Sequence, residues 1–269
     1  MRSESTLKVH LRDLALQASV PVDAAGYVSD IQEQLLAPLS QAVQAEFGAG
    51  KGQELTTKMR AVHSSSACTV NFFEYWRQQG ATDTVARALG YDGGGYQLGF
   101  ESQRPTGFGG TPPHLDVELS GPHPVGIEAK VIEPWRSGVK SGFRSTYFTA
   151  AKAQYWSNAP ACLQMARAIS DGNLHFAHLD AAQLIKHGLG LTRAHGPLSF
   201  DLLLLWYPPP GHPEVVETMR TEIRRFTAWV APELRFRALT WQQLADGLDA
   251  AADPGHQAFL SRLRSRYFA

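Results

Sequence analysis

Three short segments in the middle of the chain alternate between apolar and polar residues. The segments 96–102, 113–119 and 125–132 show the period of two that is typical of a strand with one buried face. Glycine-rich residues at 107–110 and the turn SGPHP at 120–124 separate them. The pattern predicts a meander of three strands.

Two further segments predict strands later in the chain. The sequence SFDLLLLWY at 199–207 is a continuous apolar run bounded by turn residues, which is typical of a central strand covered on both faces. Residues 234–239 predict a last strand.

Helical spacing of apolar residues surrounds these strands, whereas residues 1–25 show little pattern. Pro38 and Pro160 fall inside two of the helical segments and are expected to kink or divide them. The predicted helices are 27–47, 54–80, 83–89, 150–169, 177–188, 214–229, 241–251 and a short basic one at the C-terminus. The order of elements predicts an α/β fold in one domain.

Composition narrows the class of protein only slightly. Hydrophobic residues at 43% and charged residues at 19% are typical of a globular protein. The 25 basic and 25 acidic residues cancel, which neither indicates nor excludes nucleic-acid binding, because a local basic face is enough.

The cysteines, the N-terminus and the longest apolar run together predict a soluble cytoplasmic protein. Cys68 and Cys162 lack metal-ligand spacing and are interpreted as free thiols in a reducing compartment. The N-terminus does not resemble a signal peptide, and the longest apolar run, 202–207, is too short to span a bilayer.

The candidate chemistry lies on the second and third predicted strands. Alternation allows Asp116, Glu128 and Lys130 to converge on one side of a hairpin. Carboxylate oxygens suit Mg²⁺, which can polarise a phosphodiester and generate hydroxide near neutral pH. The lysine can orient the attacking water or offset charge in the transition state. Alternation alone fits a simpler interpretation equally well, in which these charges form the solvated face of an antiparallel sheet.

The segment that follows the third strand combines cations with aromatic rings. Arg136, Lys140 and Arg144 are interleaved with aromatic residues, namely Trp135, Phe143, Tyr147 and Phe148. Cations meet phosphates and rings stack on bases, so the segment is a candidate nucleic-acid contact. A mobile solvated loop explains the charges equally well but not the four aromatic residues.

The spacing of an aspartate and a Glu-x-Lys triplet twelve residues later resembles the PD-(D/E)xK nuclease superfamily, which has a restriction-endonuclease-like fold. The motif that names the superfamily has a proline directly before the aspartate. Here the nearest proline, Pro113, stands three residues before Asp116. The stretches HSSSACTVNFFEYW, FESQRPTGFGGTPPHLDVEL and GIEAKVIEPW also resemble a bacterial branch of restriction-endonuclease-like proteins that implies no definite substrate.

The resemblance implies a core of a mixed sheet flanked by helices at 67–207, with an N-terminal helical extension at 1–66. Residues 208–269, a helix, a strand and further helices, would complete the fold. It implies Asp116 and Glu128 as metal ligands, Lys130 as the catalytic lysine and Glu101 as an extra ligand. Some superfamily members carry a functional glutamine on the next helix, and Gln164 is the candidate here.

The function expected from the resemblance is a Mg²⁺- or Mn²⁺-dependent nuclease that hydrolyses DNA in restriction, defence or repair. A homodimer is one expectation, since many nucleases that cut both strands use two-fold symmetry. The alternative is a catalytically silent relative that binds nucleic acid or a partner protein.

A hydrolase of another kind is a weaker third hypothesis. It would place His63, His114 or His123 at a metal, but none has HExxH-like spacing. The sequence also lacks a GxSxG elbow and a dinucleotide-binding GxGxxG after a strand.

Overall fold

The structure is a computed structural model that describes residues 2–49, 54–137 and 142–268. Its centre is a mixed sheet with the strand order β1-β2-β3-β4-β5. The strands are β1 (Gln97–Gln103), β2 (His114–Ser120), β3 (Val125–Lys130), β4 (Asp201–Trp206) and β5 (Arg235–Thr240). β1, β2 and β3 form an antiparallel meander, and β3, β4 and β5 run parallel.

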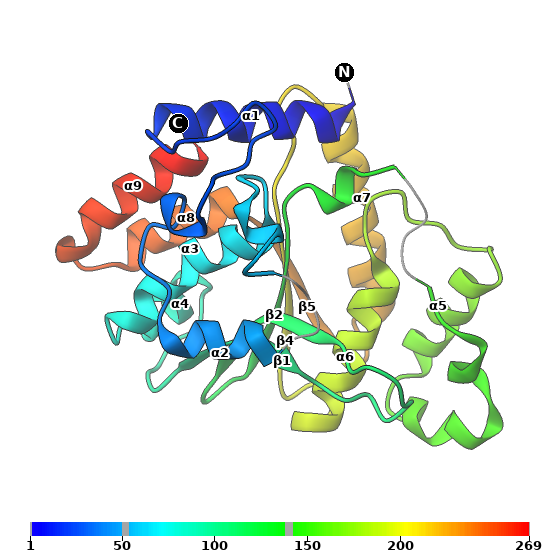
Figure 1. The fold of residues 1–269 in the computed structure, drawn as a ribbon. Helices are drawn as coiled ribbons and strands as arrows, with labels where there is room; N and C mark the ends of the chain where they lie inside the picture. Colours follow the sequence, from blue (N-terminus) through cyan, green and yellow to red (C-terminus); the bar gives the residue numbers. More distant parts are fainter. Residues whose placement is uncertain (1, 50–53, 138–141, 269) are drawn as a thin grey trace.

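Helices cover both faces of this sheet. The α-helices are α1 (Ser3–Gln17), α2 (Gln41–Ala49), α3 (Ser65–Gln78), α4 (Thr82–Ala88), α5 (Pro160–Ser170), α6 (Ala181–His195), α7 (Pro213–Val230), α8 (Trp241–Ala251) and α9 (Gln257–Tyr267). Figure 1 shows α3, α4, α8 and α9 on one side of the sheet and α6 and α7 on the other, with α5 outside them. This three-layer α/β arrangement with an N-terminal helix confirms the predicted restriction-endonuclease-like fold.

Short 3₁₀ helices join several of these elements. They are η1 (Ile31–Glu33), η2 (Lys58–Arg60), η3 (Glu133–Trp135), η4 (Ser145–Phe148), η5 (Ala150–Trp156) and η6 (Pro254–His256). Within the described ranges, no helix is long and apolar enough to cross a membrane.

All five predicted strands are confirmed to within a few residues. β4 carries the continuous apolar run and is buried at every position, because it lies between β3 and β5 in a sheet that helices cover on both faces (Figure 1). In β2, Leu115, Val117 and Leu119 are fully buried, as the alternation predicts.

The N-terminal region is helical where it starts, in agreement with the predicted helical extension. Residues 3–17, in a stretch whose sequence shows little pattern, form α1, and Leu7, Leu11 and Leu14 on it are buried at helical spacing. The prediction for the next segment is wrong. The helix predicted over 27–47 is limited to η1 and α2. Tyr27, the first residue of that predicted helix, instead forms a β-bridge with Ala61, and a β-bridge requires extended backbone.

Two prolines shape the helices as expected. Pro160 occupies the first turn of α5, where its missing N–H costs no helical hydrogen bond, and the preceding residues form η5 instead. Pro38 lies before α2 rather than inside a helix.

Close approach of α6 to its neighbours depends on glycine. A Cβ atom at Gly190 would overlap the carbonyl oxygen of Arg104, and one at Gly188 would overlap the Leu234 side chain. The absence of a side chain at these two positions lets α6 lie against the connection after β1 and the segment before β5. The helix therefore reaches the sheet closely enough to place side chains beside β3.

We expect Gly190→Ala to destabilise the protein by about 1–3 kcal/mol, because backbone atoms must move to admit the methyl group. Gly48→Ala is the matched control, since its Cβ would meet nothing within 4 Å inside α2. Higher helix propensity should make the control neutral or stabilising by roughly 0.5–1 kcal/mol. Urea unfolding measures both, and equal stability of the two variants would contradict the close approach.

Candidate active site

Asp116 is held where the pairing of β2 and β3 ends. The last paired residues are Val117 and Ile127, so Asp116 and Glu128 follow directly outside the paired stretch. The Asp116 side chain accepts a hydrogen bond from the backbone N–H of Ala129 at 2.7 Å. The end of the ladder therefore leaves a backbone donor on β3 that fixes the Asp116 carboxylate against that strand.

Glu128 lies between Lys130 and His187. Its side chain is only 2% exposed and forms an ion pair with Lys130, two residues further along β3. On the other side, Nε2 of His187, from α6, lies 2.8 Å from Glu128 Oε2 in an ion-pair contact that lacks hydrogen-bond alignment. The glutamate therefore bridges β3 and α6.

Electrostatics at this site follow from burial and these contacts. Burial alone would raise the pKa of Glu128, but the Lys130 ammonium and the His187 ring outweigh burial and lower the pKa to about 2. Burial likewise opposes the charged form of Lys130, and the carboxylates of Glu128 and Asp116 outweigh it and raise the lysine's pKa. The ion pair is therefore fully charged at neutral pH.

Asp116 behaves differently from Glu128. Burial raises its pKa well above the ordinary value, and the negative charge of Glu128 raises it further. The Lys130 ammonium and the Ala129 N–H act in the opposite direction without cancelling the shift. Two carboxylates of unlike pKa thus lie beside one lysine, an arrangement typical of functional sites.

The simpler interpretation of these charges as a solvated strand face is wrong for the two glutamates. Glu118 is 3% exposed and Glu128 is 2% exposed, because α6 covers this face of the sheet. Glu118 has partners of its own, an ion pair with Arg104 and a contact of 3.3 Å with Nε2 of His195. At these two positions the face is a buried polar layer rather than a solvent-exposed surface.

Glu101 lies close to this group but in a contact of its own. Its Oε2 atom is 3.2 Å from Nδ1 of His114, and its backbone has a φ of 51°, which places a bend in β1 opposite Asp116. Burial raises the pKa of Glu101, and the hydrogen bond from His114 opposes that shift.

The donors at this site suit a small hard cation. Asp116 and Glu128 offer carboxylate oxygens, and burial together with the negative charge of Glu128 raises the pKa of Asp116, so a bound cation would favour its ionised form. Mg²⁺ commonly takes one or two carboxylates and keeps several waters. Across the described ranges, no three His, Cys, Asp or Glu side chains come together as a metal-binding group.

The histidines of the weaker hydrolase hypothesis lie on separate elements. His114 contacts Glu101, whereas His123 Nε2 lies 2.9 Å from Asp201 Oδ1. His63 is buried, and its pKa is lowered to about 4 by burial, with Lys8 and Arg136 contributing.

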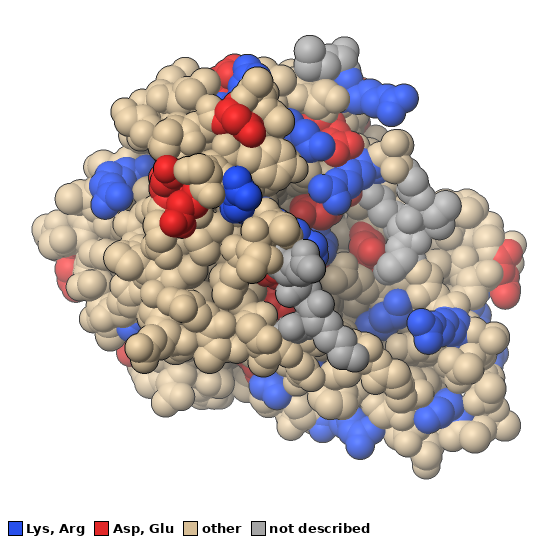
Figure 2. Space-filling model, in the orientation of Figure 1, with Lys and Arg blue, Asp and Glu red and all other residues tan. Residues whose placement is uncertain are grey.

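A cavity of about 200 Å³ opens beside Glu128 and Lys130. Its walls come from β3, β4, α6, α7 and η3, and Gln183 of α6 lies on its lining. Figure 2 shows a hollow near the middle of the face in view, with acidic side chains within it and basic side chains around its margin.

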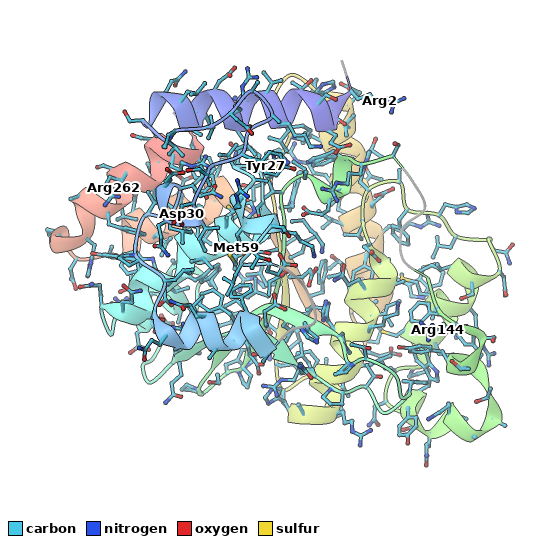
Figure 3. The ribbon with its side chains drawn as sticks, viewed as in Figure 1. Arg2, Tyr27, Asp30, Met59, Arg144 and Arg262 are labelled. Carbon is cyan, nitrogen blue, oxygen red and sulfur yellow. The ribbon has the colours of Figure 1, made fainter. Side chains whose placement is uncertain are left out.

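The predicted nucleic-acid contacts lie on the segment after β3 and on α5. Arg136 is exposed and lies 3.5 Å from Glu4, Arg144 is exposed, and Lys140 lies outside the described residues. Gln164 is exposed on α5, whereas Gln183 lines the cavity beside Glu128. Figure 3 places Arg144 and Arg262, which belongs to the basic helix α9, on opposite sides of the molecule.

The aromatic residues of the segment after β3 pack together. Phe108 stacks on Tyr147 with ring centroids 4.5 Å apart and contacts Trp156 at 5.1 Å. Phe143 and Phe148 also face Trp156. Three of the four rings that suggested base stacking therefore pack around Trp156 and Phe108, whereas Trp135 packs against His178 and Trp206.

His187 is the residue at this site that the sequence analysis missed. It is fully buried on α6, in register with Leu184 and Leu191 on the covered face of the helix. A histidine at a helical spacing between buried leucines was the available signal, since a buried polar group needs a partner.

Fold and site together define a class, an α/β protein of restriction-endonuclease-like fold with a carboxylate–lysine group at the end of a strand pair. The chain belongs to the family described as Restriction Endonuclease associating with ARP, whose model matches residues 12–268. No curated protein and no solved structure matches the chain.

Proposed function

We propose that the protein is a metal-dependent nuclease of the PD-(D/E)xK type that hydrolyses DNA phosphodiester bonds. The observation that carries the proposal is the arrangement of Asp116 beside the Glu128–Lys130 ion pair at the end of the β2–β3 ladder. Membership of a restriction endonuclease family supports the same reaction class and DNA as the substrate.

Asp116 and Glu128 would hold Mg²⁺ or Mn²⁺, which when bound polarises the phosphodiester and lowers the pKa of a water molecule. Glu101 is proposed as an additional carboxylate near them. The raised pKa of Lys130 keeps its proton on Nζ, so the lysine acts as a cation and hydrogen-bond donor rather than as a base. It orients water and offsets negative charge that develops on the phosphate.

A cleavage assay tests this function. Plasmid, linear duplex and single-stranded DNA are incubated with the protein in Mg²⁺, in Mn²⁺ and in excess chelator. We expect cleavage of at least one substrate with either metal and none with chelator. Cleavage that is unchanged in chelator would contradict the metal-dependent mechanism.

One observation favours a second candidate, a catalytically silent protein that binds nucleic acid or a partner. The Lys130 ammonium pairs with Glu128 and His187 also contacts it, so this carboxylate already has partners within the chain. The family description says that its members associate with a component called ARP, which fits a binding role. This candidate predicts binding that survives Asp116→Ala and does not depend on metal.

We expect His187→Ala to lower the cleavage rate or the metal affinity by roughly 10–100-fold, as is usual when a residue that orients a metal ligand is removed. The variant frees the Glu128 carboxylate on its α6 side. His175→Ala, at an exposed position, is the matched control. A His187→Ala variant that loses thermal stability but keeps full activity and affinity would show that the histidine serves only the fold.

A further inference from the structure

The cavity beside Glu128 and Lys130 has two kinds of wall. Leu179, Leu184, Leu204 and Met219 supply apolar surface from the segment before α6, from α6, from β4 and from α7. The charged pair of β3 lies on the same cavity, so a ligand inside it would contact apolar side chains and lie near the proposed site of cleavage.

The size of the cavity limits what can enter it. At about 200 Å³ it is smaller than the ~300–1,000 Å³ of sites for drug-sized ligands. A cavity of that size suits one heterocyclic ring system rather than a base pair within a duplex. A ring with apolar faces and polar edges also matches walls of this kind, with the Gln183 amide available to an edge.

The rim of the cavity is held in place by hydrogen bonds. Glu222 of α7 accepts hydrogen bonds from the backbone N–H groups of residues 177, 178 and 179, two of them at 2.9 Å. Asp180 caps α6 by accepting from the Gln183 N–H at 2.9 Å. His178 and the carbonyl of Pro134 are 3.0 Å apart, which joins the rim to η3. A pre-formed cavity of this kind is typical of a ligand site.

We propose that this cavity receives one unstacked nucleobase of the DNA strand whose phosphate lies at Lys130. The protein therefore acts on DNA that is unpaired at the cleavage position, either single-stranded or opened at an end. This inference rests on the proposed nuclease function, because Lys130 defines where the phosphate lies.

The test uses an oligonucleotide with a single 2-aminopurine, whose fluorescence rises when the base leaves its neighbours. Binding to the full-length wild-type protein is measured in chelator, so that no cleavage occurs, with the oligonucleotide single-stranded and in a duplex. We expect the single strand to bind about tenfold more tightly and to brighten on binding.

Two variants of α6 separate the cavity from the rest of the helix. Leu184→Phe fills this cavity, whereas Leu189→Phe enlarges a leucine of similar burial that lines a different cavity, beside Tyr155. We expect Leu184→Phe to weaken single-strand binding by roughly tenfold and to abolish the brightening, and Leu189→Phe to change neither. Gln183→Ala, at a partly buried position, provides a second variant of the same cavity if Leu184→Phe fails to fold.

Each result either supports or overturns the proposal. Brightening that only the cavity variants abolish supports it, whereas no binding by the wild type, or equal binding by all variants, overturns it. Failure of the nuclease function has a different signature, which is brightening without cleavage in Mg²⁺ or Mn²⁺. Metal-dependent cleavage that Leu184→Phe and Gln183→Ala leave unchanged retains the nuclease and overturns the base-binding cavity.

Discussion

Lys130→Ala is expected to lower the rate of DNA cleavage by at least about 10²–10³-fold, the usual effect of removing one group that stabilises transition-state charge. The ammonium contacts Glu128 and also balances the charge of Asp116, and in the proposed reaction it would offset the charge that develops on the phosphate. Cleavage rates of wild type and variant under identical metal and DNA concentrations give the measurement.

A second substitution separates catalysis from folding. Lys130→Ala also removes the ammonium that pairs with Glu128, which costs stability because Glu128 is 2% exposed. Lys130→Arg keeps the positive charge and the ion pair but replaces the compact ammonium group with a planar guanidinium group. We expect Lys130→Arg to unfold near the wild-type temperature and still cleave poorly. If activity instead follows stability in both variants, Lys130 is a structural partner of Glu128.

The sheet was predictable from the sequence because its signals are local. Alternation in β2 reports one buried face, and the apolar run of β4 reports two buried faces, so each strand could be recognised without knowing its neighbours. Helix α1 also has a local signal in the sequence, which is the helical spacing of Leu7, Leu11 and Leu14. Burial of these three leucines stabilises the helix despite the polar residues between them.

Parts of the candidate site depend on contacts between distant segments. The sequence places Asp116, Glu128 and Lys130 on neighbouring strands, and the structure brings them together; their catalytic roles remain proposals. His187 was missed because its partner, Glu128, is reached only when α6 packs against β3. The burial of Glu118 depends on a distant segment in the same way, since its cover comes from α6 and from Arg104.

Asp116→Ala is expected to abolish binding of Mn²⁺ or Mg²⁺ in calorimetry, because it removes one of two carboxylates and the Ala129 N–H loses its acceptor. Asp116→Asn isolates the charge, since its amide oxygen can still accept that hydrogen bond. Glu101→Gln tests the additional ligand and should weaken binding less. Asp92→Ala, at an exposed position outside the site, is the control.

The raised pKa of Asp116 adds a second signature to the same measurement. Below that pKa the carboxyl keeps its proton, and a metal ion must displace the proton to bind, so affinity should rise with pH until Asp116 is ionised. Proton release, read from heats in buffers of different ionisation enthalpy, should be present in wild type and absent from Asp116→Asn. The titrations are carried out with and without a DNA oligonucleotide, so that metal binding is also detected if it requires a DNA phosphate. If wild type binds no metal in either case while DNA binding persists, Asp116 is not a metal ligand, and the protein acts by binding alone.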